Sequence, residues 1–174
     1  MPKVKKSAAV YRATWPTAWG PMGGLASRNG ISGIILPHYQ PDDLEALMAW
    51  EYPKALSDEG PFEALIDATR DFFNGKAPDF SEVQIDLPGP ETFSGLVYRG
   101  CMEIEYGRTL SYSQLAIKIN REGSARAVAT ALSKNPTPII VPCHRVIYSN
   151  GQMGGYSGEG GPDQKQRLLD LEKP

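Results

Sequence analysis

The sequence predicts an α/β protein of two domains, because strand-like and helix-like segments are segregated along the chain and a proline-rich stretch separates them. The chain has 174 residues, of which 41% are hydrophobic and 22% charged, which suits one full-sized globular domain or two small ones. Residues 76–90 are rich in proline, as is typical of a linker. We therefore expect an N-terminal α/β domain over residues 1–88 and a mainly helical C-terminal domain over residues 89–174.

The N-terminal elements are predicted as strands followed by one helix. A β-prone segment at 8–15 precedes two more, at 22–27 and 31–36, which flank a two-residue hairpin loop at Asn29-Gly30. We expect a loop after this hairpin and then a helix over about 61–74. Its first residue is a proline and a glycine follows its end, as helices favour.

Short helices are predicted in the C-terminal half. Apolar residues at helical spacing favour a helix from Phe93 to near Tyr106-Gly107. Ser111 and Gln114 have the spacing of a capping box, which starts a second helix. Ser124 is the expected cap of a third, which ends before Asn135-Pro136. Two short helices joined by a glycine-containing turn are a helix-turn-helix candidate.

Charge is distributed unevenly along the chain. The net charge is -2, which by itself argues against a nucleic-acid binder. However, residues 40–100 carry 13 acidic and 4 basic side chains, whereas residues 101–150 carry 6 basic and 3 acidic ones. The helix-turn-helix candidate therefore lies in a basic segment that is compatible with DNA.

Cysteine and histidine are too few for a disulfide scaffold or a zinc site. The chain has two of each, and their spacing matches no paired metal-ligand pattern. No signal peptide and no long apolar run is recognisable. We expect a cytoplasmic protein, or a nuclear one in a eukaryote, that works without metal or cofactor.

An apolar run at residues 138–147 brings Cys143 next to His144 and Arg145. Cysteine attacks as a thiolate, and a nearby imidazole or guanidinium lowers its pKa. The alternative is that Cys143 is a small buried hydrophobic residue, which is also our interpretation of Cys101. Adjacent residues of a strand point to opposite faces, so Cys143 and His144 can cooperate only at a bend or through a water, and Pro142 would supply such a bend.

The motif around Cys143 resembles that of the O6-alkylguanine-DNA alkyltransferases, repair proteins that move an alkyl group from guanine O6 onto their own cysteine. The resemblance rests on Pro142-Cys143-His144-Arg145-Val146, preceded by Asn135-Pro136-Thr137-Pro138 and followed by Gly155-Tyr156-Ser157-Gly158. It extends upstream through Ser111-Tyr112-Ser113-Gln114-Leu115-Ala116 and Ala125-Arg126-Ala127-Val128. The resemblance implies a ribonuclease-H-like N-terminal domain and a winged helix-turn-helix-like C-terminal domain.

The resemblance also implies a role for each matching residue. Cys143 is the alkyl acceptor, His144 deprotonates it through a water, and Glu172 orients His144. Tyr112 donates a hydrogen bond to the base, and Asn135 acts as a hinge of the turn that bears the cysteine. The pocket for the base is implied to consist of Tyr112, Val146, Tyr156, Ser157 and Gly158, with the Ser157 backbone N–H on guanine O6.

The implied partner is double-stranded DNA, docked through its minor groove to a monomeric protein. Arg126 enters the base stack in place of the flipped nucleotide, and Ala127, Ala129, Ser111 and Tyr112 complete the DNA surface. The family commonly has glycine where this chain has Ala129 and Thr130, and the added methyl groups affect the depth of docking. The tail after Gly158 is also longer and more acidic than in the family.

Three other functions are compatible with parts of this pattern. A lesion-binding protein of the alkyltransferase-like kind would recognise the base without transfer, but those proteins lack the cysteine. A transcription regulator would use the same helix-turn-helix on a specific DNA sequence. A cysteine hydrolase would need a Cys–His pair built from distant residues rather than adjacent ones.

Overall fold

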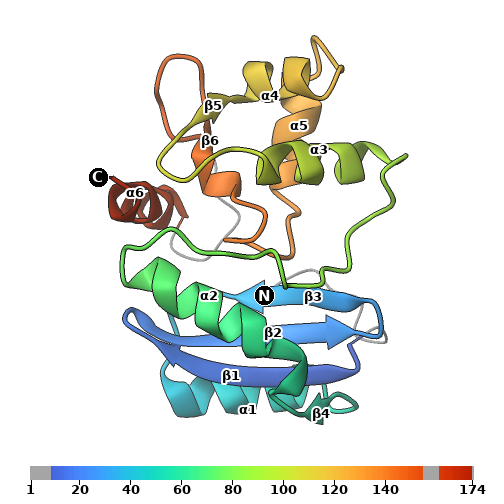
Figure 1. The fold of residues 1–174 in the computed structure, drawn as a ribbon, viewed down its shortest axis with the longest axis vertical. Helices are drawn as coiled ribbons and strands as arrows, with labels where there is room; N and C mark the ends of the chain where they lie inside the picture. The colour runs from blue at the N-terminus through green and yellow to red at the C-terminus, as the bar shows by residue number, and fades with distance from the viewer. Residues whose placement is uncertain (1–8, 155–160, 174) are drawn as a thin grey trace. The chain divides into compact units, whose positions relative to one another are not determined.

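The computed structural model describes residues 9–154 and 161–173. Contacts divide the chain into two compact units, residues 1–86 and 87–174 (Figure 1). The predicted boundary after residue 88 falls two residues later. In the described ranges, no helix is long and apolar enough to cross a membrane.

A four-stranded sheet forms the centre of the N-terminal unit. The strands are β1 (Tyr11–Thr17), β2 (Gly20–Ser27), β3 (Gly30–Ile35) and β4 (Leu56–Ser57), in the order β3-β2-β1-β4. β2 is antiparallel to both β1 and β3, and β4 is parallel to β1.

The predicted hairpin is confirmed, with its loop one residue earlier than expected. Ser27 pairs with Gly30 across Arg28 and Asn29. Of these four residues, only Gly30 has a positive φ, +125°. The loop therefore places the glycine at the start of β3 and leaves Asn29 outside the left-handed region.

Two helices cover opposite faces of the sheet, α1 (Pro41–Glu51) and α2 (Glu63–Phe73), the latter preceded by a 3₁₀ turn, η1 (Gly60–Phe62) (Figure 1). Two adjacent glycines of β2 let the segments on both faces approach the sheet closely. A Cβ added at Gly23 would lie 2.6 Å from Met48 Sδ of α1, and one at Gly24 would lie 2.6 Å from the Phe62 ring. Successive strand residues point to opposite faces, so each glycine serves one face.

The helix α1 was not predicted, since the sequence between the hairpin and Pro61 was expected to be a loop. Its N-terminal signals are ordinary, with Pro41 at the first position and two aspartates in the first turn. Only Leu44 and Met48 are buried, which is too narrow an apolar stripe to be recognised. Packing on the sheet stabilises this helix.

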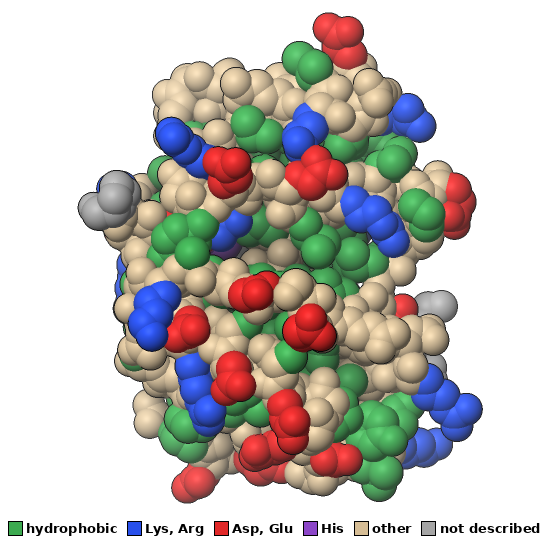
Figure 2. All heavy atoms as spheres, viewed as in Figure 1, with side chains coloured by type: hydrophobic (Ala, Val, Ile, Leu, Met, Phe, Trp, Pro, Cys, Tyr) green, Lys and Arg blue, Asp and Glu red, His purple; other side chains and the backbone are tan. Residues whose placement is uncertain are grey.

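Acidic side chains lie on the exposed sides of the two helices of the N-terminal unit. They include Asp42 and Asp43 on α1, and Glu63, Asp67 and Asp71 on α2. Figure 2 shows several of the acidic side chains on the visible face of this unit. The acidic charge of residues 40–100 therefore belongs mainly to this unit, which leaves the C-terminal unit less acidic.

The C-terminal unit is mainly helical. Its helices are α3 (Phe93–Met102), α4 (Tyr112–Lys118), α5 (Ala125–Leu132) and α6 (Gly161–Leu171), with short parallel strands β5 (Leu110–Ser111) and β6 (Val146–Ile147). The core of the unit contains Val97, Cys101, Leu115 and Val128, all completely buried. The packing interpretation of Cys101 is therefore confirmed.

Two helix ends differ from the prediction. α3 ends at Met102, well before Tyr106, because the backbone N–H of Ile104 bonds to the Cys101 carbonyl in a tighter turn (3.0 Å). Ser124 does occupy the position before α5, but its side chain makes no capping hydrogen bond. The capping box is confirmed, with both reciprocal bonds between Ser111 and Gln114 present.

Candidate active site

Cys143 lies in a 3₁₀ turn, η2 (Cys143–Arg145), which provides the bend that the sequence required of Pro142. The N–H of Cys143 donates to Val141 O (2.8 Å) and that of Arg145 donates to Pro142 O (2.9 Å). Ile139, four residues before the cysteine, has a φ of +76°, a conformation that costs a β-branched residue about 1–3 kcal/mol. Tertiary packing therefore holds this segment in a shape that the isolated chain would avoid.

Asn135 connects the segment after α5 to this turn. Its Nδ2 donates to Val141 O (2.8 Å) and to Cys143 Sγ (3.3 Å). Its Oδ1 accepts from the backbone N–H of Thr137 (3.1 Å). One amide thus fixes the backbone before the turn and contacts the sulfur, while the hinge role implied for it stays a prediction.

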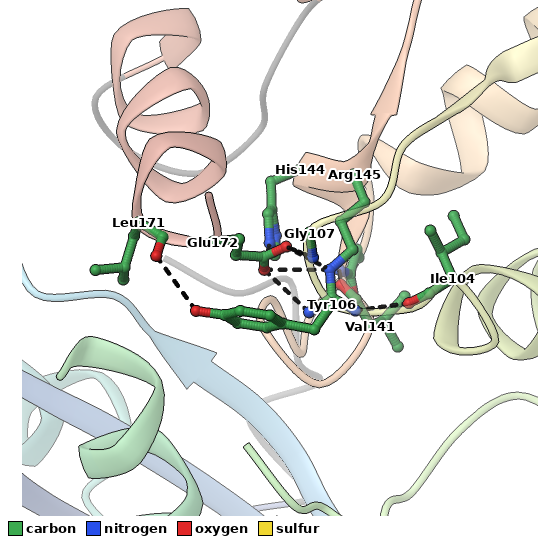
Figure 3. Close-up of polar contacts among 9 residues, drawn as sticks. Ile104, Tyr106, Gly107, Val141, His144, Arg145, Leu171 and Glu172 are labelled. Carbon is green, nitrogen blue, oxygen red and sulfur yellow. Dashed lines mark hydrogen bonds and ion pairs between the residues drawn. The ribbon is translucent and has the colours of Figure 1, made fainter. Parts of the chain in front are cut away.

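Glu172 and His144 form a buried pair although 28 residues separate them. His144 Nε2 lies 2.7 Å from Glu172 Oε1, and both side chains are completely buried (Figure 3). Glu172 directly follows α6 and its other carboxylate oxygen accepts from the backbone N–H of Gly107 (3.0 Å). A residue so near the chain end would ordinarily be frayed, but these contacts hold it in the core.

Arg145 completes this cluster, with its guanidinium on Glu172; from the sequence it was expected to act on the thiol of Cys143. Its Nε and Nη2 both donate to the Glu172 carboxylate at 2.9 Å, and its Nη1 donates to Ile104 O (2.6 Å) (Figure 3). Its guanidinium carbon lies 5.7 Å from the centre of the Tyr106 ring, within cation–π range. Arg145 therefore neutralises the buried carboxylate and joins it to the turn after α3.

The electrostatics of the cluster favour an ionised Glu172 and a neutral His144. Burial alone would raise the pKa of Glu172, but hydrogen bonds from His144 and Arg145 outweigh it and lower that pKa to about 2. Burial lowers the pKa of His144, and the positive charge of Arg145 acts in the same direction against the attraction of Glu172. The imidazole is therefore neutral at neutral pH: Nε2 keeps its proton for the Glu172 carboxylate, and the other ring nitrogen can accept one.

Burial raises the pKa of the Cys143 thiol, while the Asn135 hydrogen bond and the positive charge of Lys165 lower it. The resting sulfur is therefore a thiol that needs a base. Lys165 is itself almost completely buried, and its Nζ donates to Val146 O (2.6 Å). Sequence reasoning missed this lysine. Lys165, Leu168 and Glu172 have i, i+3, i+7 spacing, which places all three on one helical face, and the structure shows that this face is buried.

Tyr112 begins α4 and is buried in the same core cluster as Cys143 and Val146. Burial raises the pKa of its hydroxyl to about 12. The group therefore stays protonated at neutral pH and is available as a hydrogen-bond donor. Lys165 Nζ lies 5.7 Å from the centre of its ring.

The residues expected on the DNA surface have different surroundings. Arg126 and Ala127 are exposed on α5, whereas Ala129 is half-buried. Ser111 is buried, and its hydroxyl accepts the N–H of Gln114 in the capping box. The DNA-binding role implied for these residues stays a prediction.

Three expected pocket residues, Tyr156, Ser157 and Gly158, lie outside the described residues. Within residues 9–154 and 161–173, no group of three or more His, Cys, Asp or Glu side chains could hold a metal ion.

Known proteins with similar sequences and structures agree on one family. Residues 92–174 match the model of the 6-O-methylguanine DNA methyltransferase DNA-binding domain. A methylated-DNA–protein-cysteine methyltransferase of Mycobacterium tuberculosis is 42% identical over 116 residues, which are 67% of this chain and 68% of the relative. An inducible one from Bacillus subtilis is 36% identical over 148 residues, 82% of this chain and 80% of the relative.

The same family is found among solved structures. The crystal structure of M. tuberculosis OGT in complex with DNA superposes with a TM-score of 0.75 at 33% identity, and covers 94% of this chain and 93% of that one. The mixed α/β fold is thus shared with that protein. By sequence and by fold, the chain belongs to the methylated-DNA–protein-cysteine methyltransferase family.

Proposed function

We propose that this protein repairs DNA by moving a methyl or other small alkyl group from O6-alkylguanine irreversibly onto Cys143. O4-alkylthymine is a second candidate substrate. The observation that carries the proposal is the buried cluster in which Glu172 holds His144 directly beside the cysteine in sequence. Family membership supports the same reaction, since the relatives are named for methyl transfer from DNA to a protein cysteine.

In the proposed reaction, neutral His144 removes the proton of Cys143 through a bridging water, and Glu172 stabilises the imidazolium that forms. The thiolate sulfur attacks the alkyl carbon and forms a C–S bond, while the bond from that carbon to guanine O6 breaks. The bonding electron pair stays on the guanine, whose developing negative charge accepts a hydrogen bond from the Tyr112 hydroxyl. A thioether resists hydrolysis, so each molecule reacts once.

Two residues prepare the cysteine for this attack. Asn135 keeps the turn in place through Val141 O and contacts Sγ. The charge of Lys165 favours the thiolate. Both effects exist in the protein without DNA, and both lower the free-energy cost of forming the thiolate.

We propose that residues 89–174 form a winged helix-turn-helix-like domain that docks α5 in the minor groove, and that residues 1–88 form a ribonuclease-H-like domain. An alkylated base inside a duplex is out of reach of a buried sulfur, so the nucleotide must be flipped out. Exposed Arg126 would fill the gap, and Ala127, Ala129, Ser111 and Tyr112 would line the groove. The base pocket would include Val146 and, beyond the described residues, Tyr156, Ser157 and Gly158.

The test is intact-protein mass spectrometry after incubation with duplex DNA that contains O6-methylguanine. We expect a gain of one methylene unit, about 14 Da, on Cys143. The Cys143→Ala variant should bind the DNA without gaining mass. The time course should stop at one methyl group per protein molecule.

A protein that binds the lesion but stays unmodified would refute the transferase and support a lesion-binding protein. Continued turnover of substrate would instead support a hydrolase. We propose a cytoplasmic location, because an acceptor thiol must stay reduced to react.

A further inference from the structure

Tyr148 is a large aromatic residue that the proposed reaction does not use. It follows β6 directly, five residues after Cys143, and 49% of its surface is exposed. Its ring packs against that of Tyr112, with ring centres 5.3 Å apart and planes tilted by 59°. This geometry is favourable for an aromatic pair, and such pairs contribute beyond the area they bury.

A closed turn holds Tyr148 in place. Its backbone N–H donates to Gln152 O (2.9 Å), and its carbonyl accepts from the N–H of Gly151 (3.0 Å). Asn150 closes the turn further, since its Oδ1 accepts the backbone N–H of Gln152 (3.1 Å). These hydrogen bonds hold the backbone of the loop that follows β6, drawn in orange in Figure 1.

Gly154 provides a second contact to the same pair of rings. A Cβ added there would lie 2.9 Å from the Tyr112 hydroxyl oxygen and 3.2 Å from Cε2 of both Tyr112 and Tyr148. The glycine also has a φ of +67°, which disfavours other residues. Tyr112 is thus confined by Tyr148 and by the backbone at Gly154.

We propose that Tyr148 is a positioning residue that holds the Tyr112 ring so that its hydroxyl is placed for the leaving guanine. The inference rests on the proposed function and adds to it the group that orients the hydrogen-bond donor. A donor aids the reaction only where it meets the developing charge. A Tyr112 ring that can move into the space left by Tyr148 would donate less often from the productive position.

The experiment measures single-turnover methyl transfer from an O6-methylguanine duplex over a range of DNA concentrations. Tyr148→Ala should lower the limiting rate about two- to tenfold, the range that an aromatic pair contributes. The DNA concentration at half-saturation should not change. Tyr148→Phe keeps the ring and should recover the limiting rate to within about twofold.

The Tyr112→Phe background tests whether Tyr148 acts through the Tyr112 hydroxyl. In that background, Tyr148→Ala should cause no further loss, because the group that it positions is already absent. An equal further loss would overturn the inference. So would a Tyr148→Ala protein as fast as the wild type, or one altered only in half-saturation, which indicates a DNA contact.

Folding and the proposed function are checked separately. Thermal unfolding of each variant reports folding, and Tyr148→Leu provides a second variant that fills part of the space without a ring. Its limiting rate should fall as that of Tyr148→Ala does, and a wild-type rate would overturn the role of the ring. A wild-type protein that never gains a methyl group refutes the proposed function and this inference together. An active wild type whose limiting rate is unchanged by Tyr148→Ala refutes the inference alone.

Discussion

Replacing Glu172 with Gln tests the buried cluster most directly. The carboxylate accepts hydrogen bonds from His144, Arg145 and the backbone of Gly107, whereas an amide can accept with one atom only. The variant leaves Arg145 buried without its counter-ion, which costs about 3–5 kcal/mol. That is a large share of the stability of a typical domain.

The same substitution should slow alkyl transfer. A hydrogen bond to a charged group contributes about 1.5–3 kcal/mol, so loss of carboxylate support for His144 predicts a rate lower by about 10- to 150-fold. Urea unfolding measures the stability, and single-turnover transfer from O6-methylguanine DNA measures the rate. The rates are measured under conditions in which the unfolding curve shows the variant to be folded.

Asp170→Asn is the matched control. Asp170 is an exposed residue near the end of α6, two residues before Glu172, and it is paired with exposed Lys173. Exposed ion pairs contribute little, so its replacement should leave both the stability and the rate nearly unchanged. If Glu172→Gln is as stable and as fast as this control, the role assigned to the cluster is refuted.

Three further predictions follow from the site. Lys165→Met removes a charge that lowers the pKa of Cys143. The pH at which single-turnover transfer from O6-methylguanine DNA reaches half its maximal rate should move upward, and an unchanged profile would contradict the role of Lys165. Asn135→Ala leaves Val141 O without its side-chain partner and should destabilise the protein by about 1–3 kcal/mol. Asn135→Asp keeps the oxygen that accepts from the Thr137 N–H but loses the N–H that donates to Val141 O. Urea unfolding should show a similar loss of stability for both variants. Acid should destabilise the wild type in two steps. Below about pH 6.5, His144 is protonated in the unfolded chain but not in the native protein, so the stability falls. Between about pH 4.5 and 2, the same holds for Glu172, and the stability falls again. The stability difference between wild type and Glu172→Gln should therefore shrink below pH 4.5, and a constant difference would contradict the lowered pKa of Glu172.

Local signals predicted the elements that depend on neighbouring residues. The hairpin around Asn29 and the capping box of Ser111 with Gln114 both formed, because each depends on hydrogen bonds within a few residues. The helix α1 was missed, because its two buried residues, Leu44 and Met48, become a recognisable face only when the sheet lies beneath them. Sequence patterns within a few residues give no information about that sheet.

The candidate site divides in the same way. The motif at Cys143 and His144 is continuous in sequence, so its chemistry could be recognised from residue types and spacing. Arg145 lies inside that motif, yet its role as the counter-ion of Glu172 became visible only with the fold. Lys165 was missed because a lysine is rarely completely buried, and sequence alone favours an exposed position for it.

By itself, the sequence determined the family resemblance, the motif that places Cys143 beside His144, and the bend expected at Pro142. Only the tertiary structure decided that Glu172 is buried against His144 rather than frayed at the chain end. The physical reason is distance along the chain. A contact across 28 residues has no periodic signal, and its free energy depends on the charges, hydrogen bonds and burial that the folded core provides.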